Sequence, residues 1–381
     1  MKKKRILYLW GTALALMALV LFLSFAFIAA KDRSFSEMEN RNLQQFPALS
    51  ADSFVTGRFE SSFETYVSDQ FPFRDSWVRL NGLMQQMLGK REINGIFLGK
   101  DGYLIQNFTM PDETLTENTV RAVTAFASRH PEMPMYVLVA PSALTVCENL
   151  LPAGAPAGDE NGYVDRLRRE LKADNLRFVD VREALQTLRE TEQVYYRTDH
   201  HWTTPAAYAA YCEFRTAAGL KGGPATYDRR LVSDSFHGTL TAMCGCRTEE
   251  TDEIIVFVPQ NENLNRVVSY PAEGVSSVSF YDTAKLGTRD QYALFFGGNH
   301  PLVKIETDSS AEKTLLVFKD SYANCFVPFL TADYSEIVMV DPRYFTDELE
   351  PLIAAEGVDE VLFLYNANTL STDRSLAADL Q

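Results

Sequence analysis

The segment TLLVFKDSYAN at residues 314–324 decides the fold of this chain. Its first five residues, Thr-Leu-Leu-Val-Phe, form a short apolar run of the kind found in strands that are buried on both faces of a sheet. The polar triplet Lys-Asp-Ser follows at once, and a helix is expected to begin there. Similar short runs occupy residues 135–140, 178–181, 336–340 and 360–365. Such strands indicate a parallel sheet whose functional residues gather at the carboxyl ends of the strands.

Helical patterns separate the strands at residues 76–90, 116–129, 162–173 and 205–218. Residues 225–310 differ, because apolar and polar residues alternate there among many turn residues. We therefore predict an α/β fold: a parallel sheet flanked by helices, with an inserted β-rich region.

The N-terminus has the pattern of a membrane signal. Four basic residues at 2–5 precede residues 6–30, which contain no charge. At about 1.5 Å per residue this run is long enough to cross a ~30 Å hydrocarbon core. The preceding charges predict a cytoplasmic N-terminus and an extracytoplasmic remainder. A cleaved signal peptide, with residues 24–26 as the cleavage site, is the alternative.

Three parts of the chain are expected from these patterns: an N-terminal anchor or uncleaved signal at 1–30, a juxtamembrane segment at 31–75, and a main domain at 76–381 with its β-rich insertion at about 225–310.

The composition narrows the class of protein. The chain has 381 residues, of which 46% are hydrophobic and 23% charged, as in an ordinary globular protein. Residues 31–381 carry 32 basic and 51 acidic side chains, a net charge of −19. Nucleic-acid binding needs a basic face, so we expect no nucleic-acid partner. Five cysteines are too few for a disulfide scaffold, and an odd number outside the cytoplasm leaves at least one thiol free.

The first segment with chemical potential is YYRTDHHWTTP at residues 195–205. Asp199 and His201 are two apart, so in an extended chain they point the same way. The carboxylate could then orient the imidazole, as the acid does in a hydrolytic triad. A structural hydrogen-bonded pair is one alternative. A metal held with His200 is another, but we expect no metal because no further ligands stand out.

Ser321 supplies the complementary group. It is the last residue of the polar triplet at the carboxyl end of the strand, where the free N–H groups of a helix start could stabilise an oxyanion. A plain helix N-cap is the alternative. Together the two segments contain a nucleophile, a base and an orienting acid, although the sequence does not show that they meet.

The string Asp199-His200-His201-Trp202 resembles the signature of the DHHW family. That family is similar to the SGNH-hydrolase-like proteins of alginate O-acetylation, whose motif is Asp-x-His-Trp. The resemblance extends to residues 39–41, 69–74, 238–240 and 319–321. It implies an SGNH-hydrolase-like fold from about residue 35 to the C-terminus.

The resemblance also implies roles for single residues. Asp199 and His201 match the Asp and His of the motif, and Ser321 matches the nucleophile of a Gly-Asp-Ser-like block. Lys319 replaces the usual Gly. The order Asp, His, Ser is permuted from that of ordinary SGNH esterases, as expected for the alginate-type branch. His200 receives no catalytic role.

Ordinary SGNH enzymes take further oxyanion donors from the ends of neighbouring strands. By order along the chain, Asn366 is the best candidate for such a donor, and a turn or cap is its alternative. Arg343 is a candidate for binding the oxyanion or an anionic substrate, and a salt bridge is its alternative.

We therefore expect a single-pass membrane protein whose extracytoplasmic domain is an acyl esterase or O-acetyltransferase. It would act on a cell-surface or secreted polysaccharide through a Ser-His-Asp acyl-enzyme, without a metal or organic cofactor. The resemblance makes a membrane-bound acyl-transfer protein a plausible partner. A non-catalytic polysaccharide-binding or scaffold subunit in the cell envelope is the main alternative, and a metal-dependent hydrolase is a distant third.

Overall fold

The computed structural model describes residues 2–36, 41–246, 248–260 and 265–381. Glu39 and Asn40, which contribute to the family resemblance, lie outside the described residues. Two compact units make up the chain, and each consists of two stretches of sequence: Met1–Leu88 with Ala242–Arg247, and Gly89–Thr241 with Thr248–Gln381. The domain limits expected from the sequence remain a prediction.

The second unit is built on an eight-stranded sheet. Its strands, in spatial order, are β11 (Val275–Ser277), β10 (Arg266–Tyr270), β12 (Leu302–Thr307), β14 (Glu336–Val340), β13 (Thr314–Lys319), β15 (Glu360–Asn366), β6 (Met135–Ala140) and β7 (Leu176–Val179). The five strands from β14 to β7 are mutually parallel. The remaining three extend the sheet in antiparallel fashion. Every residue of β6, β13 and β15 is buried, as their apolar runs predict.

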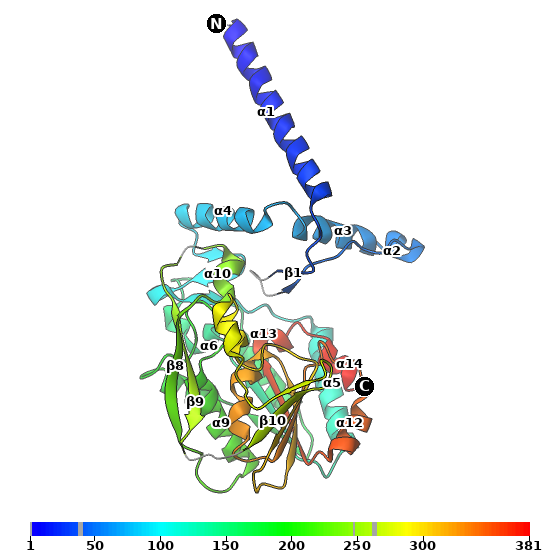
Figure 1. Ribbon diagram of the computed structural model, residues 1–381, viewed down its shortest axis with the longest axis vertical. Helices are drawn as coiled ribbons and strands as arrows, with labels where there is room; N and C mark the ends of the chain where they lie inside the picture. Colours follow the sequence, from blue (N-terminus) through cyan, green and yellow to red (C-terminus); the bar gives the residue numbers. More distant parts are fainter. Residues whose placement is uncertain (1, 37–40, 247, 261–264) are drawn as a thin grey trace. The chain divides into compact units, whose positions relative to one another are not determined.

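Helices flank this sheet. Figure 1 shows α5, α12 and α14 close together on one side, with α9 apart from them. The helices of this unit are α5 (Glu113–Arg129), α6 (Ala143–Val146), α7 (Glu160–Glu170), α8 (Arg182–Leu188), α9 (Thr204–Ala218), α11 (Val327–Leu330), α12 (Leu349–Glu356), α13 (Ala367–Leu370) and α14 (Ser375–Asp379). The 3-10 turns are η1 (Lys100–Gly102), η2 (Glu148–Leu150), η3 (Thr283–Gly287), η4 (Gln291–Leu294) and η5 (Ser321–Cys325). The predicted α/β architecture is confirmed.

Residues 225–310 are rich in β-strands, as expected, but these strands belong to two different sheets. Among the described residues, β8 (Tyr227–Phe236) and β9 (Asp252–Pro259) form a separate two-stranded sheet, whereas β10, β11 and β12 continue the main sheet. A small sheet of β3 (Glu92–Ile93), β4 (Ile96–Leu98) and β5 (Leu104–Gln106) precedes the main one. The turn Asn94-Gly95, with φ of 53° and 75°, joins β3 to β4 as an Asn-Gly hairpin turn does.

The first unit begins with α1 (Lys2–Ala29), whose stretch Tyr8–Ala29 is long and apolar enough to cross a membrane. This helix fits a signal anchor. Strands β1 (Phe35–Ser36) and β2 (Arg41–Asn42) and helices α2 (Ala51–Val55), α3 (Arg58–Asp69) and α4 (Arg74–Met87) complete the unit, together with the end of α10 (Thr239–Cys244).

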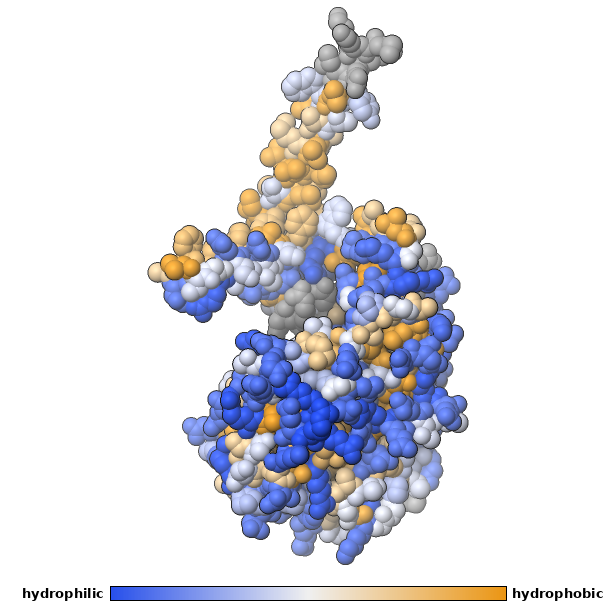
Figure 2. All heavy atoms as spheres, turned by 180° about the vertical axis from the view of Figure 1, so that it is seen from behind, coloured by the Kyte–Doolittle hydropathy of each residue, from blue (hydrophilic) through white to orange (hydrophobic). Residues whose placement is uncertain are grey.

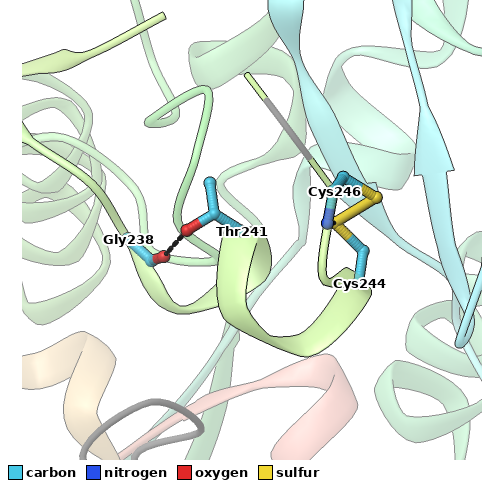
Figure 3. Close-up of a disulfide and its surroundings, with 4 residues drawn as sticks. All are labelled: Gly238, Thr241, Cys244 and Cys246. Atoms are coloured by element: carbon cyan, nitrogen blue, oxygen red, sulfur yellow. Dashed lines mark hydrogen bonds between the residues drawn. A yellow bond between two sulfur atoms is a disulfide. The ribbon is translucent and has the colours of Figure 1, made fainter. Parts of the chain in front are cut away.

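A disulfide joins Cys244, the last residue of α10, to Cys246 (Figure 3). Gly245, with φ of 65°, lies between the two cysteines and turns the chain there. Cys147, Cys212 and Cys325 are free thiols.

Candidate active site

A continuous chain of hydrogen bonds joins Asp199, His201 and Ser321. Asp199 Oδ1 lies 2.6 Å from His201 Nδ1, and His201 Nε2 lies 2.7 Å from Ser321 Oγ. An ionised carboxylate only accepts hydrogen bonds, so the imidazole proton lies on Nδ1 and Nε2 accepts from the serine hydroxyl. Asp199 and His201 are buried, whereas Ser321 is partly exposed. The geometry is that of a nucleophile, a base and an orienting acid.

The three residues come from two loops at the ends of secondary-structure elements. Ser321 opens η5, with only Asp320 between it and β13, and His201 lies just before α9. Asp199 Oδ1 also accepts the backbone N–H of His201 at 3.0 Å. This local bond folds the acid and the base into an Asx turn, which fixes the imidazole beside the carboxylate.

The second oxygen of Asp199 is held by Thr239. The Thr239 backbone N–H and hydroxyl both donate to Asp199 Oδ2, at 2.8 and 3.0 Å. Gly238 packs so closely on Asp199 that a Cβ there would overlap the aspartate side chain. Burial by itself would raise the pKa of Asp199, but the neighbouring imidazoles and the donated hydrogen bonds hold that pKa well below its usual range. The acid is therefore ionised at neutral pH.

The imidazole of His201 is packed between two rings. Tyr292 stacks on one face of this ring, with ring centres 3.7 Å apart and planes at 11°. The ring centre of His200 lies 3.9 Å from that of His201. The Tyr292 hydroxyl donates to the backbone oxygen of Ser321 at 3.1 Å. Tyr292 thus contacts both the base and the nucleophile segment, which restricts the base to one plane.

His200 has different partners from His201, although the two are adjacent. Its Nδ1 lies 2.8 Å from the Thr239 hydroxyl. Burial and repulsion from His201 lower the pKa of His200 to about 4. The ring is therefore neutral at physiological pH and adds no charge beside the base.

The residues that follow the base and the nucleophile also bind each other's segments. Trp202 is fully buried, and its indole N–H donates to the Tyr322 carbonyl at 3.0 Å. In return the Tyr322 hydroxyl donates to the carbonyl of His200. This reciprocal pair, the Trp202–Tyr322 clasp, holds the two loops in register.

The start of η5 determines which backbone donors can face an oxyanion. Asp320 is the N-cap and accepts the Tyr322 N–H at 2.9 Å, so that donor is occupied. The other Asp320 oxygen accepts the Asn366 N–H at 2.8 Å. Among the described residues, the Ser321 N–H has no hydrogen-bond acceptor. It is the best backbone candidate for an oxyanion donor.

Asn366 lies at the end of β15 and is buried. Its side-chain oxygen accepts the Asn368 N–H at 3.0 Å, and its amide donates to the Ala140 carbonyl at 3.0 Å. It therefore caps α13, which was the alternative. A side-chain amide has two N–H bonds, so a second donor is left, and an oxyanion role for Asn366 remains a prediction.

Arg343 forms the salt bridge that was its alternative. Its Nε and one terminal nitrogen donate to the two oxygens of Asp341 at 2.8 and 2.6 Å. Lys319 Nζ lies 3.5 Å from Oδ2 of the same Asp341, and Lys319 is almost fully buried. Burial lowers the pKa of Lys319, while Asp341 opposes that shift. The departure from Gly at 319 thus adds a buried amine, which also donates to Asn299 and Asn324.

Asp199, His200 and His201 also form a group whose possible metal-ligating atoms lie within 4.8 Å of one another. Each of these groups already has protein partners: Asp199 with Thr239 and His201, His201 with Ser321, and His200 with Thr239. A metal would have to displace several of these bonds, so the donor set fits a hydrogen-bonded triad better.

Two family models match the chain. The model for DHHW proteins matches residues 39–132, and the model for the SGNH hydrolase-like domain of the acetyltransferase AlgX matches residues 98–279. The resemblance predicted from the sequence is confirmed. Asp199 and His201 lie inside the AlgX-type match, whereas Ser321 lies beyond both. The proximity of Ser321 to His201 is therefore seen in the structure and is not part of either family match.

Solved structures share this fold. A DHHW family protein from Eubacterium siraeum is 23% identical, with a TM-score of 0.64, and the alignment covers 76% of this chain and 95% of that one. PatB1 from Bacillus cereus, solved with a sulfonyl adduct, is 19% identical, with a TM-score of 0.59 and coverage of 73% and 98%. No curated protein sequence matches the chain.

Sequence reasoning did not select Tyr292 or Thr239 as site residues. Thr239 belongs to the segment 238–240 that carries part of the resemblance, so a signal for it was present. Tyr292 lies in the β-rich region, and no motif pointed to it.

Proposed function

We propose that this protein is an SGNH-type O-acetyltransferase or acetylesterase that acts on a cell-surface or secreted polysaccharide. The hydrogen-bonded chain from Asp199 through His201 to the partly exposed Ser321 is the observation that carries the proposal. The family match to an acetyltransferase domain supports acyl transfer as the class of reaction. The acidic composition disfavours a polyanionic glycan.

In the first step, Ser321 Oγ attacks the carbonyl carbon of an acyl donor while His201 Nε2 takes the hydroxyl proton. The ionised Asp199 stabilises the imidazolium that results. The Ser321 N–H, with Asn366 as the candidate second donor, stabilises the oxyanion. When the intermediate collapses, the leaving group takes the proton from His201 and the acyl group stays on Ser321.

In the second step, His201 removes a proton from an incoming hydroxyl, which attacks the acyl-enzyme. A sugar hydroxyl gives an O-acylated polysaccharide, and water gives hydrolysis. The ester bond to Ser321 breaks and Ser321 Oγ regains the proton. Both outcomes use the same acyl-enzyme.

The proposed location constrains the source of the acyl group. With α1 as an anchor and the basic residues at 2–5 in the cytoplasm, the site would be extracytoplasmic. Acyl-CoA donors remain in the cytoplasm, so a membrane-bound acyl-transfer protein would have to supply the group.

The test is acyl-enzyme formation by the full chain in detergent, with an activated acetyl ester as donor. We expect an acetyl adduct in the intact mass and ester turnover, both lost in Ser321→Ala. Ser128→Ala is a matched control, because Ser128 is exposed on α5 and bonds only within that helix. Turnover that persists in Ser321→Ala would contradict the mechanism. Glycan binding without any adduct would favour the scaffold role.

A further inference from the structure

One face of α4 presents apolar side chains to solvent. At roughly 100° per residue these side chains fall within one stripe about 100° wide. All five are exposed: Trp77, Leu80, Met84, Met87 and Leu88. The other side of the helix is packed, since Gly82 lies directly against Cys244 and Gly245. The stripe therefore has the pattern of a buried face, but no described part of the chain covers it.

The neighbouring helices add to this surface. Phe54 and Val55 on α2, and Phe71 and Phe73 between α3 and α4, are also exposed. Figure 2 shows hydrophobic side chains on these helices as well as on α1. An open hollow of about 690 Å³ is lined by side chains of α3 and α4, among them Phe63, Val67 and Trp77. The combined surface is defined here as the α2–α4 face.

Short connections hold this face close to the end of α1. Asp32 accepts a hydrogen bond from the Tyr66 hydroxyl at 3.1 Å, and Arg33 pairs with Asp75 at 3.1 Å. Gln70 exchanges two further bonds of 2.9 Å with the backbone of Arg33. Arg33 is four residues beyond Ala29, the last residue of α1. Four residues span at most about 14 Å, so α3 and α4 must lie near the level at which α1 leaves the bilayer.

We propose that the α2–α4 face lies in the lipid headgroup region of the membrane, with the α4 stripe inserted among the acyl chains. This rests on the proposed anchoring by α1. Trp suits this position because its amphipathic ring is enriched at membrane interfaces, and Phe and Leu are typical of the apolar face of helices that lie in the interface. The helices carry both acidic and basic residues, so attachment through apolar burial, and not attraction to anionic lipid, is expected.

The test uses the fluorescence of Trp77 in the full chain reconstituted in phosphatidylcholine vesicles. The chain has three Trp residues, of which Trp202 is fully buried. Trp10 lies in α1, so it is removed as Trp10→Phe. With lipid brominated near the top of its acyl chains, we expect about half of the Trp77 emission to be quenched. A Trp10→Phe, Trp77→Phe variant reports Trp202 alone and should show almost no quenching.

A matched pair of charges on α4 tests the orientation of the helix. Met84→Glu places a carboxylate in the stripe and should reduce the quenching of Trp77 at least twofold. Gln86→Glu adds the same charge on the opposite side of α4 and should leave the quenching unchanged. Equal effects of the two substitutions would overturn the proposed orientation.

Vesicle flotation separates failure of the face from failure of the anchor. If the chain floats but Trp77 escapes quenching, the anchor is retained and the membrane position of the α2–α4 face is overturned. That position is also overturned if a second copy or another protein covers α4. A chain that does not float would overturn both.

Discussion

In the candidate active site the side chains of Asp199 and His201 are buried and hydrogen-bonded, whereas on α4 a row of apolar side chains stands in solvent. Asp199 accepts four hydrogen bonds, while Trp77 and Met84 have an exposed face with nothing packed on it. Buried polar groups must find partners within the protein, because water cannot reach them. An exposed apolar stripe points instead to a partner outside the chain. The carboxylate of Asp199 has its partners within the protein, whereas among the described residues the apolar stripe has none.

The largest test of this difference is Asp199→Asn. The amide cannot accept from both His201 and Thr239 as the carboxylate does, and it favours the wrong imidazole tautomer. We expect acyl turnover to fall about 10³- to 10⁴-fold while the fold is retained. Asp290→Asn, at the N-cap of η4, is a control that should cost much less. Near-normal turnover by Asp199→Asn would mean that the carboxylate does not orient the base.

The same carboxylate predicts a pH dependence of stability. The folded-state pKa of Asp199 lies below its ordinary value of 3.8. Its contribution to the free energy of unfolding is therefore complete above about pH 3.8 and is lost as the pH falls below that value. The Tm difference between wild type and Asp199→Asn should be constant from pH 6 to 8 and shrink in acid. A difference that grows in acid would contradict the assignment.

A smaller effect is expected at Thr239. Thr239→Ala removes the hydroxyl donor to Asp199 and the partner of His200, but keeps the backbone N–H bond. Loss of one hydrogen bond to a charged group corresponds to about tenfold in turnover. Thr239→Ser should restore most of the activity. Failure of serine to rescue would show that the threonine acts through packing.

Tyr292 should separate stacking from hydrogen bonding. Tyr292→Phe keeps the ring on His201 and should change turnover less than about threefold. Tyr292→Leu removes the stacked ring, and an aromatic pair contributes about 0.5–1.5 kcal/mol, so a loss of up to about tenfold is expected. Circular dichroism checks that both variants fold. If both variants lose turnover equally, the hydroxyl contact with Ser321 matters more than the stack.

The smallest effect is expected on α4. Leu80→Ser replaces an exposed side chain, so in detergent the Tm should stay within about 1 °C of wild type and acyl turnover should be unchanged. A cooperative loss of several degrees would show that the stripe packs against protein, and the contrast between the two regions would disappear.

The sequence predicted the strands well because burial on both faces requires continuous apolar runs. Met135–Ala140 and Glu336–Val340 have the predicted limits. The pairing of strands in the β-rich region was harder to predict, because alternating apolar and polar residues do not show which strands pair. Only the structure shows that β12 joins β14. At the site, motif residues were predictable, whereas Tyr292 was not, because its role depends on a contact between distant segments.

The Trp202–Tyr322 clasp has a consequence for the order of folding. His201 and Ser321 are 120 residues apart, and β10 to β13 must be placed between them before the clasp can close. Contacts of such long sequence separation form slowly, because the intervening chain must first lose its freedom. Reaction of Ser321 with a serine-directed probe during refolding should therefore lag behind the recovery of helical circular dichroism. The reactivity of Ser321 would then report the final step of folding, and partly folded chains would carry no reactive serine.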